Sequence, residues 1–169
     1  MLIEQFRLWY QHECDCNAKI VTMIRSVPET NQTRREFSKV LILFSHLILA
    51  RKNWIHRLQT SEDLGIWVLE NTSLSELELM CAEIQESWTA YLEHQTDETI
   101  SERFNWSYED KKLSWIIAEM LAQLNGHSWY HRGQIAQLVD LLGGEVVDTD
   151  FVFWTKGLDG WIYMNRANR

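Results

Sequence analysis

The chain of 169 residues is long enough for one domain with a sizeable apolar core, so it needs neither disulfides nor a structural metal to fold. Hydrophobic residues make up 46% of the chain and charged residues 24%, with a single proline, a composition that excludes a disordered chain and favours helices. The net charge of -8, without a basic patch to override it, argues against nucleic-acid binding.

Cysteine usage and the N-terminus indicate a reducing compartment. Cys14, Cys16 and Cys81 are an odd number of cysteines, without zinc-finger or C-x-x-C spacing, so we expect reduced thiols. Residues 1–13 lack the basic flank and continuous apolar run of a signal peptide. The most apolar stretch, Val40 to Ala50, is far shorter than the roughly 20 residues of a membrane span. We therefore expect a cytoplasmic protein with no membrane partner.

Apolar residues at helical spacing predict three helices in the first part of the chain. They are expected at residues 2–24, at about 33–58, and from Thr72 or Ser73 to near His94, with a loop at 59–65. For the second helix, Thr33-x-x-Glu36 matches a capping box. Its centre is apolar nearly all round, which is typical of a helix surrounded by other helices.

The last part of the chain contains a less regular segment and the clearest helix. Between Thr96 and Lys112, aromatic and polar residues alternate as in a short strand or hairpin. A fourth helix is predicted from the spacing of its core seam, and Gly143-Gly144 ends it. The seam consists of Leu113, Ile117, Met120, Leu124, His127, His131, Gln134, Leu138 and Leu141. We expect the aromatic-rich tail, residues 145–169, to pack across the other helices as a short helix or irregular cap.

Four long helices with short connections imply an all-α fold, a four-helix bundle that forms a single domain over residues 1–169. The hairpin or irregular segment would precede the last helix.

The seam of the fourth helix changes from leucine and methionine to polar residues at His127, His131 and Gln134. Histidines four residues apart lie one turn apart on one helical face, where two imidazoles can bind one ion. His46 lies in the most apolar run of the chain and should also point inward. A buried histidine can instead bond to a carbonyl or serine, but a shared cation would satisfy all three at once.

The stretch His127-Ser-Trp-Tyr-His131-Arg132-Gly133-Gln134-Ile135, followed by Leu141-Leu-Gly-Gly144 and Thr149-Asp150, resembles the terminal motif of the DinB family. His46 matches the remaining histidine ligand of that family. One departure is Val146-Val147, where proline is frequent after the glycine pair.

The resemblance implies a bundle of up-down-down-up topology, often a homodimer, with a metal held by His46, His127 and His131 at one end. The family name comes from damage-inducible genes, which connects it with stress response. Relatives include metal-dependent hydrolases and transferases that use low-molecular-weight thiols such as bacillithiol or mycothiol. We therefore expect a metalloenzyme that acts on a small molecule by hydrolysis or thiol-dependent S-transfer. The alternative is a non-catalytic, dimeric bundle that binds a metal or ligand.

Three histidines leave coordination positions open, as in catalytic metal sites, so the attacking group would be water or a thiol at the metal. Zinc is the first choice and nickel is possible, because both accept imidazole. No carboxylate is marked by its spacing as a general base.

Residues near the histidines have two interpretations each. Gln134 would orient a ligand or bond across the bundle. Arg132 could meet an anionic substrate group, although a structural salt bridge is preferred. Tyr130 and Trp129 would line a pocket or pack in the core.

Several other residues are expected to be structural. Gly126 and Gly133 would allow close approach of a neighbouring backbone. His12, His56 and His94 are predicted to lie at the surface.

Overall fold

The computed structural model describes residues 1–108 and 111–156. It is mainly helical and contains one antiparallel pair of strands. In chain order the elements are α1 (Leu2–Arg25), the 3₁₀ helix η1 (Glu29–Asn31), α2 (Arg35–Thr60), α3 (Leu74–Glu93), α4 (Asp97–Ser101), β1 (Arg103–Tyr108), β2 (Lys111–Ile116), α5 (Ile117–Leu141) and α6 (Phe151–Lys156).

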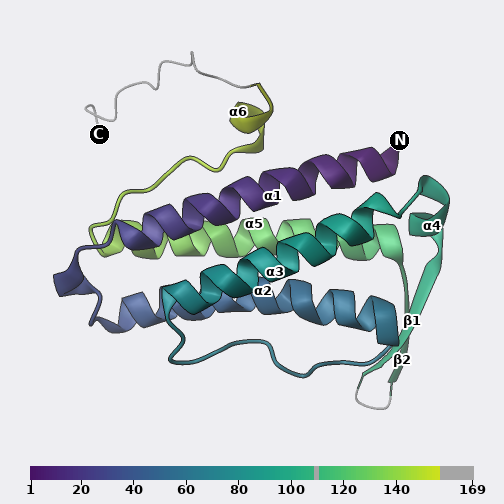
Figure 1. The fold of residues 1–169 in the computed structure, drawn as a ribbon, viewed down its shortest axis with the longest axis horizontal. Helices are drawn as coiled ribbons and strands as arrows, with labels where there is room; N and C mark the ends of the chain where they lie inside the picture. Colours follow the sequence, from purple (N-terminus) through teal and green to yellow (C-terminus); the bar gives the residue numbers. More distant parts are fainter. Residues whose placement is uncertain (109–110, 157–169) are drawn as a thin grey trace.

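The four long helices lie side by side. Helices α1 and α2 each pack against both α3 and α5. In Figure 1, α1 and α5 run in one direction along the molecule, whereas α2 and α3 run in the opposite direction. The hairpin of β1 and β2 lies at the end of the molecule where α2 and α3 finish. The prediction of a mainly helical fold is confirmed.

An apolar core fills the space between the helices. Ile20 of α1, Phe44 of α2, Trp88 of α3 and Ile135 of α5 are all fully buried. Burial of each such side chain contributes about 1.5–3 kcal/mol, so the apolar stripes hold the four helices together.

A buried ion pair also joins α1 to α2. Arg51 Nε donates to Glu13 Oε1 at 2.7 Å, and both side chains are almost completely buried. The Arg51 guanidinium lies over the rings of Tyr10 and Trp88, 5.2 and 5.0 Å from their centroids. Trp88 Nε1 donates to the Arg51 carbonyl at 2.9 Å, so this cluster connects three of the helices.

The two predicted helix starts have different outcomes. Helix α3 begins after Ser73, whose hydroxyl accepts from the Glu76 N–H while the Glu76 carboxylate accepts from the Ser73 N–H, which is a complete capping box. The capping box expected at Thr33 is wrong. Helix α2 begins at Arg35, so its N-cap residue is Arg34 rather than Thr33, and no side chain caps it. Glu36 forms an ion pair with Arg34.

The hairpin confirms the strand alternation read from the sequence. Phe104 and Trp106 are buried on one face of β1, and they pair with Trp115 and Leu113 of β2. Leu113 therefore belongs to a strand, and the prediction that it starts the last helical seam is wrong. The short helix α4 before the hairpin was not predicted.

The core face of α5 differs from the predicted seam. Met120 and Leu124 are buried as expected, but Leu141 is 60% exposed and the buried line continues through Arg132, Ile135 and Val139 instead. A seven-residue repeat drifts by about 20° per heptad relative to a straight helix, so the seam leaves the core face toward the helix end.

The glycines of α5 also differ from expectation. A Cβ atom at Gly126 or Gly133 would meet nothing within 4 Å, so the predicted close approach of a backbone is wrong. Close approach occurs instead at Gly144, where a Cβ atom would lie 2.7 Å from Val139 Cγ1. Gly143 has a φ of 76°, and α5 ends at Leu141, as the glycine pair predicts.

From Gly144 the chain returns along α1 to α6, which lies beside that helix (Figure 1). Phe151 and Trp154 of α6 pack against the ring of His12. The rest of the predicted aromatic tail, residues 157–169, lies outside the described residues.

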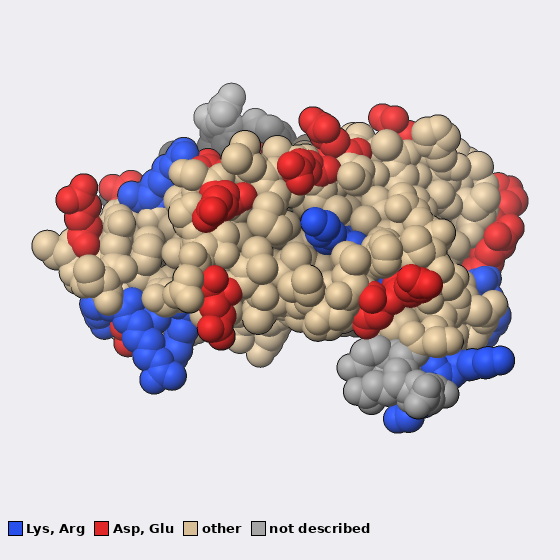
Figure 2. All heavy atoms as spheres, turned by 60° about the horizontal axis from the view of Figure 1, so that its bottom comes forward, with Lys and Arg blue, Asp and Glu red and all other residues tan. Residues whose placement is uncertain are grey.

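Charges are unevenly distributed over the face in Figure 2. Acidic side chains are spread across it, while basic side chains gather mainly toward the two ends of the molecule, with no continuous basic surface on this face. All three cysteines are free. Within the described residues, no helix is both long and apolar enough to span a membrane.

Candidate metal centre

Three histidines from two helices meet between α2 and α5. His46 lies on α2, and His127 and His131 lie one turn apart on α5. Their imidazole rings contact each other edge to face, with centroids 4.5–4.9 Å apart. One ligand nitrogen from each lies within 4.8 Å of the others. The distance from His46 Nε2 to His127 Nε2 is 3.0 Å.

Hydrogen bonds orient two of the three rings. His46 Nδ1 donates to the Trp67 carbonyl at 2.8 Å, and His131 Nδ1 donates to Gln134 Oε1 at 2.6 Å. With a proton on Nδ1, each ring directs the lone pair of Nε2 toward the cluster, which is the usual effect of such partners at metal sites. Gln134 is itself held, because its Nε2 donates to the Tyr130 hydroxyl at 3.2 Å.

Polar side chains of α2 hold the connection between α2 and α3, residues 61–73, which we call the 61–73 segment. Asn53 Nδ2 donates to the Ile66 carbonyl, and Ser45 Oγ accepts from the Leu69 N–H at 3.0 Å. Together with His46, they bind backbone groups along the segment and place the Trp67 carbonyl at the histidine cluster. The interruption of the apolar run at Ser45-His46 therefore serves both the segment and the cluster.

The surroundings favour neutral imidazoles. Burial, together with the neighbouring His131 and His46 rings, lowers the pKa of His127 to about 4. Burial also lowers the pKa of His131, against the opposing effect of its hydrogen bond to Gln134. Neutral imidazole is the form that binds a metal.

The residues present fit a divalent cation. Two nitrogen ligands of one tetrahedral zinc ion lie about 3.3 Å apart, because each Zn–N bond is about 2.0–2.1 Å. The 3.0 Å between the Nε2 atoms of His46 and His127 is close to this spacing. The described residues offer no fourth His, Cys, Asp or Glu to this group, so a metal held here would keep positions open.

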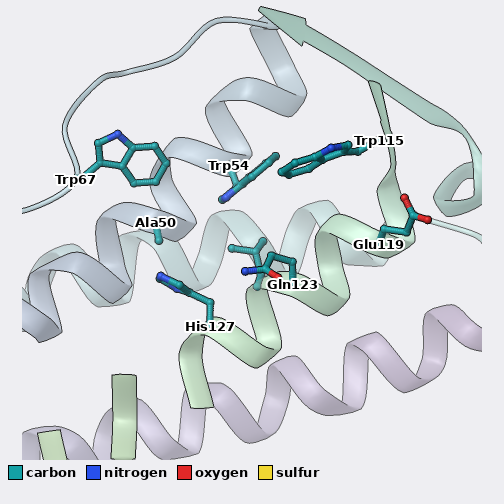
Figure 3. A pocket seen from close by; sticks show the side chains of 8 residues that line it. Ala50, Trp54, Trp67, Trp115, Glu119, Gln123 and His127 are labelled. Atoms are coloured by element: carbon teal, nitrogen blue, oxygen red, sulfur yellow. The ribbon is translucent and has the colours of Figure 1, made fainter. Parts of the chain in front are cut away.

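A pocket of about 400 Å³ opens beside His127. Its walls come from α2, α5, β2 and the 61–73 segment. In Figure 3, the rings of Trp54 and Trp115 lie across the pocket from His127 and Gln123, with Trp67 at one side and Glu119 at the far end. The lining residues are Ala50, Trp54, Trp67, Trp115, Glu119, Gln123, Leu124 and His127.

Sequence reasoning missed most of this lining, although spacing could have found part of it. Glu119 and Gln123 precede His127 at intervals of four residues, so they share its helical face. Ala50 and Trp54 follow His46 at the same interval on α2. Trp67 and Trp115 carried no such signal, because they lie outside the long helices and reach the pocket only through the tertiary fold.

Trp54 and Trp67 are held in place by a buried cation. The Arg57 guanidinium lies 4.7 and 4.8 Å from their ring centroids and 4.1 Å from that of Trp106. Arg57 Nη2 also donates to Asp63 Oδ2 at 2.7 Å. Arg57 is 2% exposed, so the pocket walls rest on a guanidinium that is itself covered.

Of the other residues proposed for the site, Tyr130 contacts the histidine cluster, whereas Arg132 lies at a second pocket. Tyr130 is 64% exposed, and its ring packs edge to face against His131. Arg132 faces a second pocket that it lines together with His12 and Trp129. The preferred salt bridge of Arg132 is wrong, since it forms no ion pair with a described residue and its Nη1 is buried without a hydrogen-bond partner.

The surface position expected for His12 is also wrong. His12 is 1% exposed, its Nε2 lies 3.0 Å from the Thr149 carbonyl, and α6 covers its ring. His94 is exposed and His56 is half-buried.

Comparison with known proteins agrees with the motif around the histidines. The sequence matches the DinB family over residues 3–159. Among curated proteins none matches the chain, and no solved structure matches it either. Because the family match covers nearly the whole sequence, the chain belongs to the DinB family.

Proposed function

We propose that this protein is a divalent-metal-dependent enzyme that acts on a small molecule, with His46, His127 and His131 as the metal ligands. The observation that carries the proposal is the convergence of three imidazoles whose outer nitrogens are taken up by the Trp67 carbonyl and Gln134, beside an open pocket. A structural metal site is closed by four protein ligands, whereas a catalytic one keeps a position for substrate.

The chemistry supplied by a divalent cation with open coordination positions is Lewis-acid activation of water or of a thiol. The chain itself contributes the binding of the cation, the orientation of two rings through Nδ1, and a largely apolar pocket beside His127. Zinc is the first candidate and nickel the second, since imidazole ligands suit both.

Two reactions start from this arrangement, hydrolysis and S-transfer from a low-molecular-weight thiol. Glu119, the one carboxylate that the described residues bring to the pocket lining, precedes His127 by two helical turns, about 12 Å along α5. It is therefore too distant to act as a general base on a group at the histidines. We further propose a four-helix bundle of up-down-down-up order, which the helix directions in Figure 1 support. From the family resemblance and the cysteine usage we also propose that it assembles as a cytoplasmic homodimer.

The test is an activity screen on zinc-loaded and nickel-loaded protein. Hydrolysis of small esters, amides and lactones would be followed in one arm, and consumption of a thiol against electrophiles in the other. We expect one of these activities to depend on the metal, to be lost in His131→Ala, and to persist in His94→Ala, a control at an exposed histidine outside the cluster. Metal binding without activity in either arm would overturn the proposal in favour of a non-catalytic metal-binding bundle.

A further inference from the structure

The lining of the pocket beside His127 carries information about the substrate. Two helical faces oppose each other across it, and each continues from a histidine of the cluster. On α2 the face runs from His46 through Ala50 to Trp54, and on α5 it runs from His127 back to Gln123 and Glu119. The small side chain of Ala50 leaves the space that a larger residue would fill.

Three of the eight residues that line the pocket are tryptophans. Trp115 stacks on Trp54, with ring centroids 5.3 Å apart and an interplanar angle of 24°. Trp115 remains 37% exposed, so part of its ring is available to a ligand. Trp67 forms a further wall (Figure 3). Flat aromatic groups pack favourably on such surfaces.

The charge carried by the side chains of the pocket lining is negative. Among the described residues, Glu119 is the only charged one in the lining, which holds no lysine or arginine. The guanidinium of Arg57 is covered by Trp54 and Trp67 and paired with Asp63, so it is not available to an anion. Indole faces attract cations, and Glu119 adds a negative charge at the end of the pocket away from His127.

We propose that the substrate of the histidine centre is a flat aromatic compound with a cationic end group and no carboxylate or phosphate. This inference rests on the function proposed above. The reacting group would lie at His127, the ring against Trp115, and the cationic group near Glu119. A thiol cosubstrate that bears carboxylates would find no lysine or arginine among the described residues of this lining, so the side chains of the pocket favour hydrolysis over S-transfer from an anionic thiol.

The test uses three probes with the same ring and different charge, namely 2-phenylethylamine, 2-phenylethanol and phenylacetate. Their dissociation constants would be measured on the full chain by NMR, following the tryptophan indole N–H signals. The metal-free protein gives the deciding comparison, because a carboxylate can coordinate a bound metal directly. We expect the amine to bind at least about tenfold more tightly than phenylacetate, with the alcohol between them.

Variants separate the contributions of ring and charge. Trp115→Ala should weaken all three probes by about tenfold, and Glu119→Gln should remove the advantage of the amine over the alcohol. Ala50→Leu should block all three probes by filling the pocket. Trp129→Ala is the matched control, because Trp129 lines a different pocket and should leave binding unchanged.

Equal affinity for the three probes, tighter binding of phenylacetate, or no binding of any probe would overturn the inference. The same titrations on zinc-loaded protein distinguish this failure from failure of the proposed function. Loss of metal binding with the charge preference intact would contradict the metal centre alone, whereas metal binding without the preference would contradict the substrate class alone.

Discussion

His131 and Gln134, which are three residues apart on α5, are joined by a hydrogen bond of 2.6 Å between Nδ1 and Oε1. Because Gln134 is also anchored to the Tyr130 hydroxyl, it fixes the ring that carries one of the three candidate ligand nitrogens. The half-buried amide thus acts on the centre through His131 rather than by direct contact with a metal.

Replacing Gln134 by alanine should weaken zinc binding by about 10–100-fold, since loss of such an orienting partner leaves the ring free to rotate. Competition with a chromophoric chelator would measure the change. Gln137→Ala is the matched control, an exposed glutamine on the same helix. Equal affinities for both variants would show that Gln134 does not position His131.

Gly126→Ala should stabilise the protein by about 1 kcal/mol, because alanine is favoured over glycine inside a helix and its Cβ would meet nothing within 4 Å. Urea denaturation would measure the free energy of unfolding. An unchanged or lower free energy of unfolding would show that the space around Gly126 is not open to a Cβ atom.

Gly144→Ala should have the opposite effect. The added Cβ would lie 2.7 Å from Val139 Cγ1 and 3.0 Å from Val27 Cγ2, and overpacking of this kind costs about 1–3 kcal/mol. The same denaturation experiment compares the two glycines directly. A neutral Gly144→Ala variant would contradict the close packing of the chain after α5 against the end of α1.

The ion pair between Glu13 and Arg51 gives a further prediction about stability. Glu13→Gln should destabilise the protein by about 3–5 kcal/mol, because it leaves the Arg51 charge buried without its partner. The double variant Glu13→Leu/Arg51→Met should be closer to the wild type than the single variant is, since no charge then remains buried. If the double variant instead lost as much free energy of unfolding as Glu13→Leu and Arg51→Met lose together, the two residues would not interact as this ion pair requires.

The features that the sequence predicted correctly depend on local spacing. His127 and His131 lie on one helical face by their interval alone, and α3 begins after Ser73, as predicted from the apolar spacing that follows it. The paired aromatic residues of the hairpin likewise follow a two-residue alternation.

The features that the sequence did not predict depend on contacts between residues far apart in the chain, or on which face of a long helix a residue occupies. His12 is buried because Thr149, 137 residues later in the chain, returns to cover it. Trp67 reaches the histidines only because side chains of α2 hold the 61–73 segment. Leu141 was placed in the core by a strict heptad, although the straight helix α5 turns that position toward solvent.

The zinc stoichiometry of the protein after loading and dialysis measures whether His46, His127 and His131 together bind one divalent metal ion. We predict about one zinc per chain in the wild type and in His94→Ala, and a loss of at least about 10-fold in retained zinc in His46→Ala, His127→Ala and His131→Ala. No zinc in the loaded wild type, or equal zinc in the wild type and the three cluster variants, would rule out a metal centre at these histidines.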